Sequence, residues 1–259
     1  MSSNAIVHDS NEIAVEEKAA GDEWVCWGTL AKVIVGIVIA YVGVRAYMHA
    51  FAFSVGLDYF EPVFKAYWMN MLYAELVFSV VTLAGICTYL WRTRDRSLET
   101  LTPEEELSRY FKWATWLVSY TLVVMIIGPI AGESDAAWHQ VVIRDTDFTP
   151  THISLFYLMV PMLIVTGVGS FLYATTRLPM HSNKHLISLG IAIGGPILIA
   201  PNIGLNEWGH TFYYAEELFG APVHWGFAGL GLALLALGGV VVHVVQRMKE
   251  LIDEVVARA

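Results

Sequence analysis

The sequence predicts an all-α membrane protein with about six transmembrane helices, and three observations lead to this fold class. Hydrophobic residues make up 56% of the 259 residues and charged residues only 15%, with a mean hydropathy of +0.54, whereas soluble domains carry about 25% charge. Six apolar runs are each long enough, at roughly 20 residues, to cross about 30 Å of hydrocarbon. None of them shows the alternating pattern of a membrane barrel strand, so only helices can satisfy their backbone hydrogen bonds.

Polar segments connect the apolar runs and define the rest of the organisation. The runs cover approximately residues 27–49, 66–91, 110–131, 153–176, 186–205 and 222–246. We expect a transmembrane domain over 24–246, an acidic N-terminal tail over 1–23 and a C-terminal tail over 247–259. The N-terminal tail lacks the basic start and apolar core of a cleavable signal. The stretch Thr102-Pro103-Glu104-Glu105 has the pattern of a capping box and predicts a short interfacial helix before the third run.

The positions of Lys and Arg predict which side of the membrane each loop faces. Eleven of these side chains lie in the tails and the even-numbered loops, whereas only Lys65 and Arg144 lie in the odd-numbered loops. Short loops rich in Lys and Arg stay in the cytoplasm. We therefore expect a multi-pass protein of an inner or intracytoplasmic membrane with both termini cytoplasmic. The periplasmic loops are then those near 50–65, 132–152 and 206–221. Lys32 and Arg45, near the ends of the first run, are expected to snorkel to the surface.

Charge and cysteine content exclude two further classes of protein. A net charge of -9 argues against a nucleic-acid partner, which requires a basic face. Two cysteines are too few for a fold held together by disulfides. Cys26 and Cys87 both fall near the ends of apolar runs on the expected cytoplasmic side, where thiols stay reduced.

The fifth apolar run is interrupted by Gly194-Gly195-Pro196 and again by Pro201. Proline removes a backbone donor and clashes with the preceding turn. A broken helix within a membrane is tolerated where protein covers it or where it lines a cavity. We expect this helix to be broken and its end to lie inside the assembly; a kink without function is the alternative.

The loop near 132–152 carries three side chains suited to metal binding. Asp135 precedes His139 by four residues, so on a helix both would lie on one face. His152 follows two residues after Pro150, and proline favours the first helical position. This places His152 in the first turn of the fourth run, where the helix dipole keeps the imidazole neutral and able to bind metal.

The loop near 206–224 repeats this arrangement. Asn206 precedes His210 by four residues, and His224 follows two residues after Pro222. The same reasoning places Asn206 and His210 on one helix face and His224 in the first turn of the sixth run. Each loop therefore offers one oxygen and two nitrogen donors, a set of three that leaves room for water, O2 or substrate.

The ligand types restrict the candidate metals but do not identify one. Imidazole and carboxylate groups without thiolate suit copper, zinc or non-haem iron. The alternative is that these residues are ordinary interfacial histidines and helix caps, and the repetition in two loops on one side favours metal sites. The remaining histidines, which lack such neighbours, are His8, His49, His181, His185 and His243.

Glu75 lies well inside the second apolar run. A carboxylate at this depth is costly and indicates function by default. Two roles are open at this stage: Glu75 relays protons, or it pairs with another side chain within the bundle.

Two long motifs surround the candidate ligands, over residues 138–152 and 201–212, and shorter ones extend them. The shorter stretches are 216–219, 221–227, 56–58, 67–70 and 91–96. In these motifs, which fall between about residues 50 and 230, the chain resembles the C subunit of the copper-containing membrane monooxygenases. This family includes particulate methane monooxygenase, ammonia monooxygenase and short-alkane relatives.

The resemblance implies a cofactor, an assembly and two ligand sets. The first metal site would be formed by Asp135, His139 and His152, and the second, which binds copper in the family, by Asn206, His210 and His224. The cofactor would then be copper, in two sites of this chain. The implied assembly is a trimer of three-subunit protomers in the lipid bilayer, with partners of A and B type and a quinol as reductant.

The leading hypothesis is therefore a subunit of a copper-dependent monooxygenase that uses O2 to hydroxylate methane, a short alkane or ammonia. We expect Asn206, His210 and His224 to form the catalytic site, because the broken fifth helix supplies space beside them. A transporter or channel for transition metals or protons is one alternative, but all six ligands lie at one face. A bis-histidine haem subunit is another, although it would not require the oxygen donors.

Overall fold

The computed structural model describes residues 24–141, 148–182, 187–197 and 216–258; side chains at 128, 129, 133, 136, 139 and 216–230 lie outside this description. The predicted all-α class is confirmed. The helices are α2 (Trp27–Val55), α3 (Pro62–Phe64), α4 (Asn70–Arg92), α5 (Pro103–Met125), α6 (Gly132–His139), α7 (Tyr157–Arg177), α8 (Pro179–Ser182), α9 (Ile187–Ile197) and α11 (Glu216–Arg258). Three π-helical segments, η1 (Lys65–Met69), η3 (Ile126–Ala131) and η4 (His152–Phe156), and a 3-10 turn, η2 (Leu98–Thr100), lie between them.

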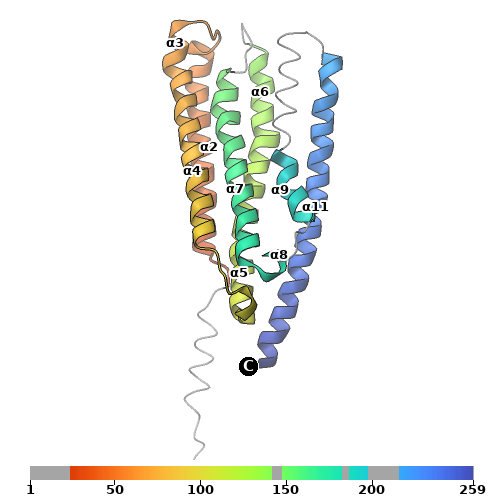
Figure 1. The fold of residues 1–259 in the computed structure, drawn as a ribbon. Coiled ribbons are helices and arrows are strands. Elements are labelled where there is room, and N and C mark those ends of the chain that lie inside the picture. Colours follow the sequence, from red (N-terminus) through yellow and green to blue (C-terminus); the bar gives the residue numbers. More distant parts are fainter. Residues whose placement is uncertain (1–23, 142–147, 183–186, 198–215, 259) are drawn as a thin grey trace, which may run out of the picture.

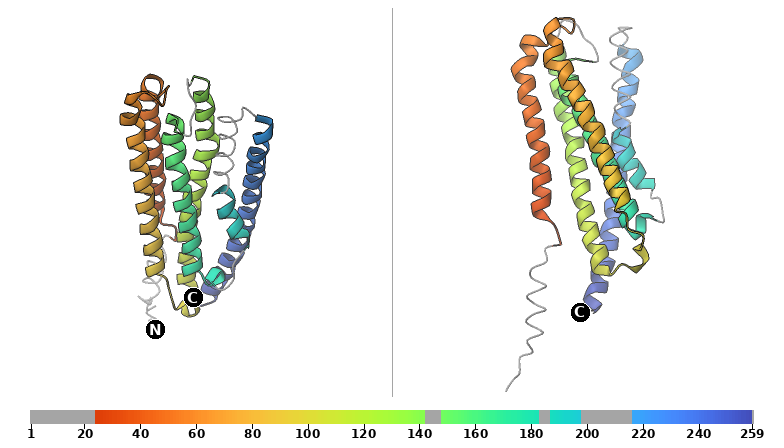
Figure 2. Two further views of the ribbon diagram at one scale, coloured as in Figure 1. Left: turned by 45° about the horizontal axis from the view of Figure 1, so that its top comes forward. Right: turned by 60° about the vertical axis from the view of Figure 1, so that its left-hand side comes forward.

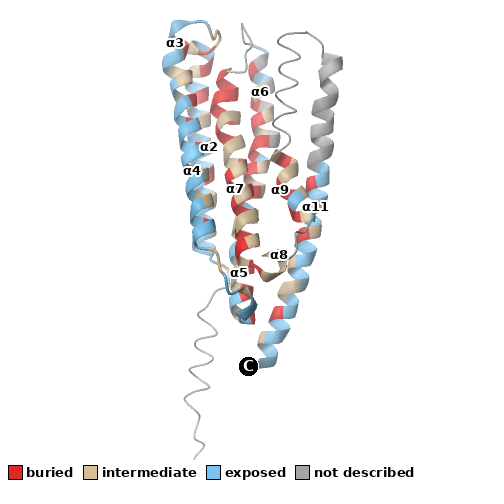
Figure 3. Ribbon diagram, in the orientation of Figure 1, coloured by how far each residue is buried: buried red, intermediate tan, exposed pale blue. Residues whose placement is uncertain are grey.

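The long helices lie side by side in an elongated bundle with α7 at its centre (Figures 1 and 2). Helix α7 packs against α4, α5 and α9, and α11 packs against α9 and α5. Figure 3 shows the buried residues concentrated on α7, whereas α2 and the outer face of α4 are largely exposed. One end of the bundle, at the top of Figure 1, carries α3 and α6 and is called the α6 end; the other is the α8 end.

Four helices in the described chain are long and apolar enough to cross a membrane. They are Trp27–Val55, Pro62–Arg92, His152–Arg177 and Gly231–Arg258, and they match the first, second, fourth and sixth predicted runs. The third run is helical in α5 and η3 but is not among these four, and α9 is a shorter apolar helix. Helix α9 continues through Gly194 to Pro196, and residues 198–215 lie outside the description. The count of six and the break in the fifth helix therefore remain predictions.

Buried hydrogen bonds join the helices where polar side chains enter the core. The Trp113 indole Nε1 on α5 donates to Ser170 Oγ on α7 over 3.0 Å, and the Tyr120 hydroxyl donates to the Ala192 carbonyl on α9 over 2.9 Å. Near the α8 end, the Arg247 guanidinium on α11 donates to both Glu106 oxygens on α5 over 3.0 and 2.9 Å. These contacts fix α5 against three neighbouring helices.

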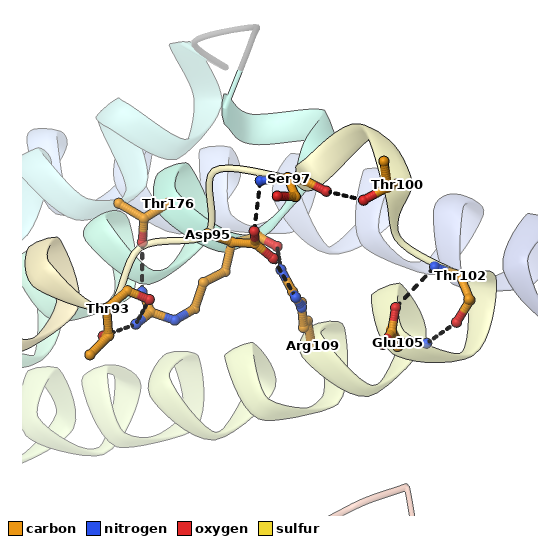
Figure 4. Close-up of polar contacts among 9 residues, drawn as sticks. Thr93, Asp95, Ser97, Thr100, Thr102, Glu105, Arg109 and Thr176 are labelled. Carbon is orange, nitrogen blue, oxygen red and sulfur yellow. Dashed lines mark hydrogen bonds and ion pairs between the residues drawn. The ribbon is translucent and has the colours of Figure 1, made fainter.

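The connection from α4 to α5 is ordered by side chains that cap its turns (Figure 4). Asp95 accepts hydrogen bonds from the Ser97 backbone N–H and from the Arg109 guanidinium, over 2.7 and 2.6 Å. Thr102 and Glu105 form the predicted capping box. The separate interfacial helix predicted there is wrong, because this cap begins α5 itself and α5 continues without interruption to Met125.

The close approach of α5 and α7 at Gly169 predicts a packing cost. A methyl group added at Gly169 would overlap the Trp116 ring, which cannot bend away as a flexible chain end could. We expect Gly169→Ala to lower the free energy of unfolding by about 1–3 kcal/mol, measured by denaturation in lipid nanodiscs. Gly85→Ala on α4, where a methyl group meets nothing within 4 Å, is the control and should be neutral or slightly stabilising. Equal stability of the two variants would contradict the packing.

The hydrogen bonds to Asp95 predict an acid-sensitive contribution to stability. The Ser97 backbone N–H and then the Arg109 guanidinium lower the pKa of Asp95 below its ordinary value. The stabilisation is therefore complete above the unfolded-state pKa, about 3.9, and is lost as the pH falls through the lower folded-state value. Thermal melting of Asp95→Asn should fall less steeply below about pH 5 than that of the wild type. Glu99→Gln, which removes an exposed acid in the same connection, should keep the wild-type slope; parallel profiles for all three proteins would refute this.

Candidate metal site at the α6 end of the bundle

Helix α6 carries two of the three ligands predicted for the first site. It follows directly on η3, and both Asp135 and His139 lie within it. Their spacing of four residues therefore puts them on one face of a real helix, as predicted. The side chain of His139 lies outside the described residues, so only its backbone position is established.

The third predicted ligand, His152, lies in the first turn of a helix, and this prediction is confirmed. The helix begins at Pro150. The preceding Thr149 accepts at its carbonyl from the Ile153 backbone N–H over 2.9 Å and at Oγ1 from the His152 N–H over 3.4 Å. Proline is compatible with this first position because its missing N–H would have had no helical partner. His152 is only 6% exposed, so its ring faces the protein interior.

Asp135 and His152 meet across the two helices. His152 Nε2 lies 3.2 Å from Asp135 Oδ1 and 3.3 Å from Asp135 Oδ2. Two ligand atoms about 2.1 Å from one metal ion, at a tetrahedral angle, are separated by roughly 3.4 Å. The spacing thus fits two donors to a shared ion as well as a direct hydrogen bond, and the mixed oxygen and nitrogen set suits a transition metal.

Two threonine hydroxyls hold this pair in place. Neither threonine is among the candidate residues predicted from the sequence. Thr151 Oγ1 donates to Asp135 Oδ1 over 2.5 Å and lies 3.3 Å from Thr149 Oγ1. Both threonines are almost completely buried. The sequence places a hydroxyl residue on each side of Pro150, at a predicted helix start. Such side chains commonly cap a helix, and this pattern could have indicated both threonines. The hydroxyl of Thr151 fixes the orientation of the Asp135 carboxylate.

Arg45 connects the edge helix α2 to the candidate site. The Arg45 guanidinium donates to Ser134 Oγ, and Ser134 Oγ donates to the Ile130 carbonyl over 2.9 Å. Ser134 directly precedes Asp135, so this contact ties α2 to the helix that carries Asp135. The expectation that Arg45 snorkels to the membrane surface stays a prediction, and the structure adds the contact of its head group with α6.

Three π-helical segments converge around the site. Segment η4 contains His152 and packs against η1 and η3. π-Helical turns are uncommon and occur frequently at functional sites. An apolar cluster that includes Trp68, Trp138 and Ile153 has members in all three segments or next to them.

The second predicted site is only partly described. Asn206 and His210 lie outside the described residues, and so does the side chain of His224. Helix α11 begins at Glu216, so the prediction that His224 lies in the first turn is wrong. Among the described side chains, no group of three or more His, Cys, Asp or Glu residues gathers to hold a metal ion.

The hydrogen bond from Thr151 predicts a measurable stabilisation of the site. Thr151→Val keeps the side-chain shape but leaves Asp135 Oδ1 without this donor. A hydrogen bond to a charged group contributes about 1.5–3 kcal/mol, and we expect a loss of that order in unfolding measurements of the purified protein. Thr151→Ser retains the hydroxyl and should lose less stability; a valine variant as stable as the serine variant would show that the bond contributes little.

Comparison with known proteins identifies the family to which the chain belongs. The family model for the C subunit of ammonia monooxygenase/methane monooxygenase matches residues 10–255. No individual curated protein matches the chain at significant similarity. Since the family model covers nearly the whole chain, the protein belongs to the family of ammonia monooxygenase and methane monooxygenase C subunits.

Proposed function

We propose that this chain is the metal-binding membrane subunit of a copper-dependent monooxygenase that uses O2 to hydroxylate a small substrate: methane, a short alkane or ammonia. The contact between Asp135 and His152 carries the proposal, because it joins an oxygen and a nitrogen donor at one end of the bundle. Membership of a monooxygenase family supplies the reaction class.

The residues at the α6 end fit a bound transition metal. Asp135 and His152 would hold it together with His139, the next position on the same face of α6. When bound, copper supplies the activation of O2 that protein side chains cannot perform. The separations of 3.2 and 3.3 Å between His152 Nε2 and the Asp135 oxygens support this ligand pair, and the Thr151 hydroxyl donates to the carboxylate.

The second ligand set, formed by Asn206, His210 and His224, is proposed as the site of substrate oxidation. This rests on the sequence pattern and on the expected irregular backbone of the fifth helix. The apolar helices around the bundle favour delivery of a hydrophobic gas from lipid. Partners of A and B type in a trimer of protomers, a quinol reductant and a periplasmic position for the α6 end complete the proposal.

Metal analysis of single variants tests the two ligand sets separately. In the intact complex, His152→Ala should remove the copper of the first site, and His210→Ala or His224→Ala that of the second, because each loses one of three ligands. Copper per complex is measured by mass spectrometry. His49→Ala is the matched control, since His49 is exposed on α2 and belongs to neither set.

The same preparations test the reaction class. Oxygen uptake by native membranes, with methane, butane and ammonia offered separately, should identify one preferred substrate. This activity should be lost in the His210 and His224 variants and kept in His49→Ala. Copper content and oxygenase activity unchanged in all ligand variants would overturn the proposal.

A further inference from the structure

Glu75 lies on the buried face of α4, within a membrane-spanning helix. The buried residues of α4 are Leu72, Glu75, Ser79 and Leu90, and the first three follow at spacings of three and four positions. Helix α4 uses the face to pack against α7 and η4. Glu75 itself is only 7% exposed, so its carboxyl group points into the bundle rather than toward lipid.

Neither carboxyl oxygen of Glu75 has a hydrogen-bond partner among the described residues. The nearest polar side chain on the same face, Ser79, donates its hydroxyl proton to the Glu75 backbone carbonyl over 2.7 Å. That hydroxyl proton is therefore engaged elsewhere. Of the two roles left open by the sequence, pairing within the bundle has no support in the described part of the chain.

The ionisable groups on the elements that pack against α4 do not compensate the charge of Glu75. Those groups are Lys65 and Tyr67 on η1, His152 on η4, and Tyr157, Tyr173 and Arg177 on α7. Arg177 lies at the far end of α4, where it donates to the Leu90 carbonyl and to Thr93. Lys65 is exposed, and ten residues, about 15 Å of helix, separate it from Glu75.

An ionised carboxylate in this position would be buried without a counter-charge or donor, at a cost far above that of a neutral acid. Glu75 is therefore held as a carboxylic acid, which carries a transferable proton. An acid kept neutral by its surroundings is the form that serves as a proton donor in enzymes.

Helix α4 packs against η4, the segment that begins with His152. Leu72, one turn before Glu75, and Trp68, one turn further, belong to the same apolar cluster as Ile153 and Leu155. Those two residues belong to the segment that begins with His152. Glu75 thus lies one helical turn along α4 from an apolar cluster that includes residues of the His152 segment.

We infer that Glu75 is a proton donor for oxygen reduction at the α6 end of the bundle. Hydroxylation of a substrate RH by O2 consumes two electrons and two protons and yields ROH and water. The electrons come from the hydroquinone reductant, and Glu75 delivers one of the two protons, becomes a carboxylate and regains a proton before the next turnover. This inference rests on the proposed monooxygenase function.

Infrared spectroscopy of the whole complex tests the protonated state independently of activity. The wild type, with carbon-13 in the glutamate carboxyl groups, should show an isotope-shifted carbonyl band of a carboxylic acid that is missing in Glu75→Gln. Ser79→Ala is the matched control, because it changes a polar side chain one turn away on the same face, and it should retain the band. Absence of the band from the wild type would overturn the inference.

Turnover tests whether the proton is used. Glu75→Gln preserves size and polarity, so copper content should stay at the wild-type level while oxygenase turnover falls by about 100-fold or more, the usual contribution of general acid catalysis. Glu75→Asp, which retains a carboxylic acid, should recover part of the rate, and Ser79→Ala should turn over normally. Wild-type turnover in Glu75→Gln would refute the donor role. A wild-type complex with the band but without any oxygenase activity would instead contradict the proposed function.

Discussion

A lipid interior supplies no hydrogen bonds, and this constraint determines which polar groups the bundle can contain. The helices satisfy their own backbones, and buried polar side chains find partners within their own helix or across a helix interface. Trp113 reaches Ser170, and Tyr120 reaches the Ala192 carbonyl. Buried groups without such a partner are few in the described chain, and Glu75 is the one carboxyl group among them. A polar group that the bundle leaves unsatisfied needs an explanation other than stability.

The two ends of the bundle hold their carboxylates in different ways. Near the α8 end, Glu106 and Asp95 each receive hydrogen bonds from an arginine, and a permanently charged guanidinium neutralises them. At the α6 end, Asp135 faces the imidazole of His152 and receives the Thr151 hydroxyl. A neutral imidazole and a carboxylate can exchange their mutual contact for a metal ion, whereas a guanidinium cannot bind one. The α6 end is therefore the end suited to metal chemistry.

Local patterns in the sequence were sufficient to predict the features that depend on one helix. The apolar runs, the capping box of Thr102 and Glu105 and the helix start at Pro150 all follow from spacing and residue type. The π-helical turns, the contact of Arg45 with Ser134 and the role of Thr151 depend on how separate helices meet, which no local pattern encodes. The first-turn prediction for His224 failed for a related reason: proline is tolerated within a membrane helix when neighbouring groups compensate for it.

The environment of Glu75 also bears on the alternative functions considered from the sequence. A buried acid within a membrane-spanning helix first favoured a proton or metal transporter, which requires a route to both faces. In the described chain, however, Glu75 is the one carboxyl group among the buried side chains without a partner, so no second such acid is present to pass a proton on to the α8 end. Burying a carboxyl group without a hydrogen-bond partner costs free energy, so stability alone does not account for Glu75. A proton donor that serves a site at one end of the bundle requires no route to the opposite face, so the environment of Glu75 fits an oxygenase subunit better than a transporter.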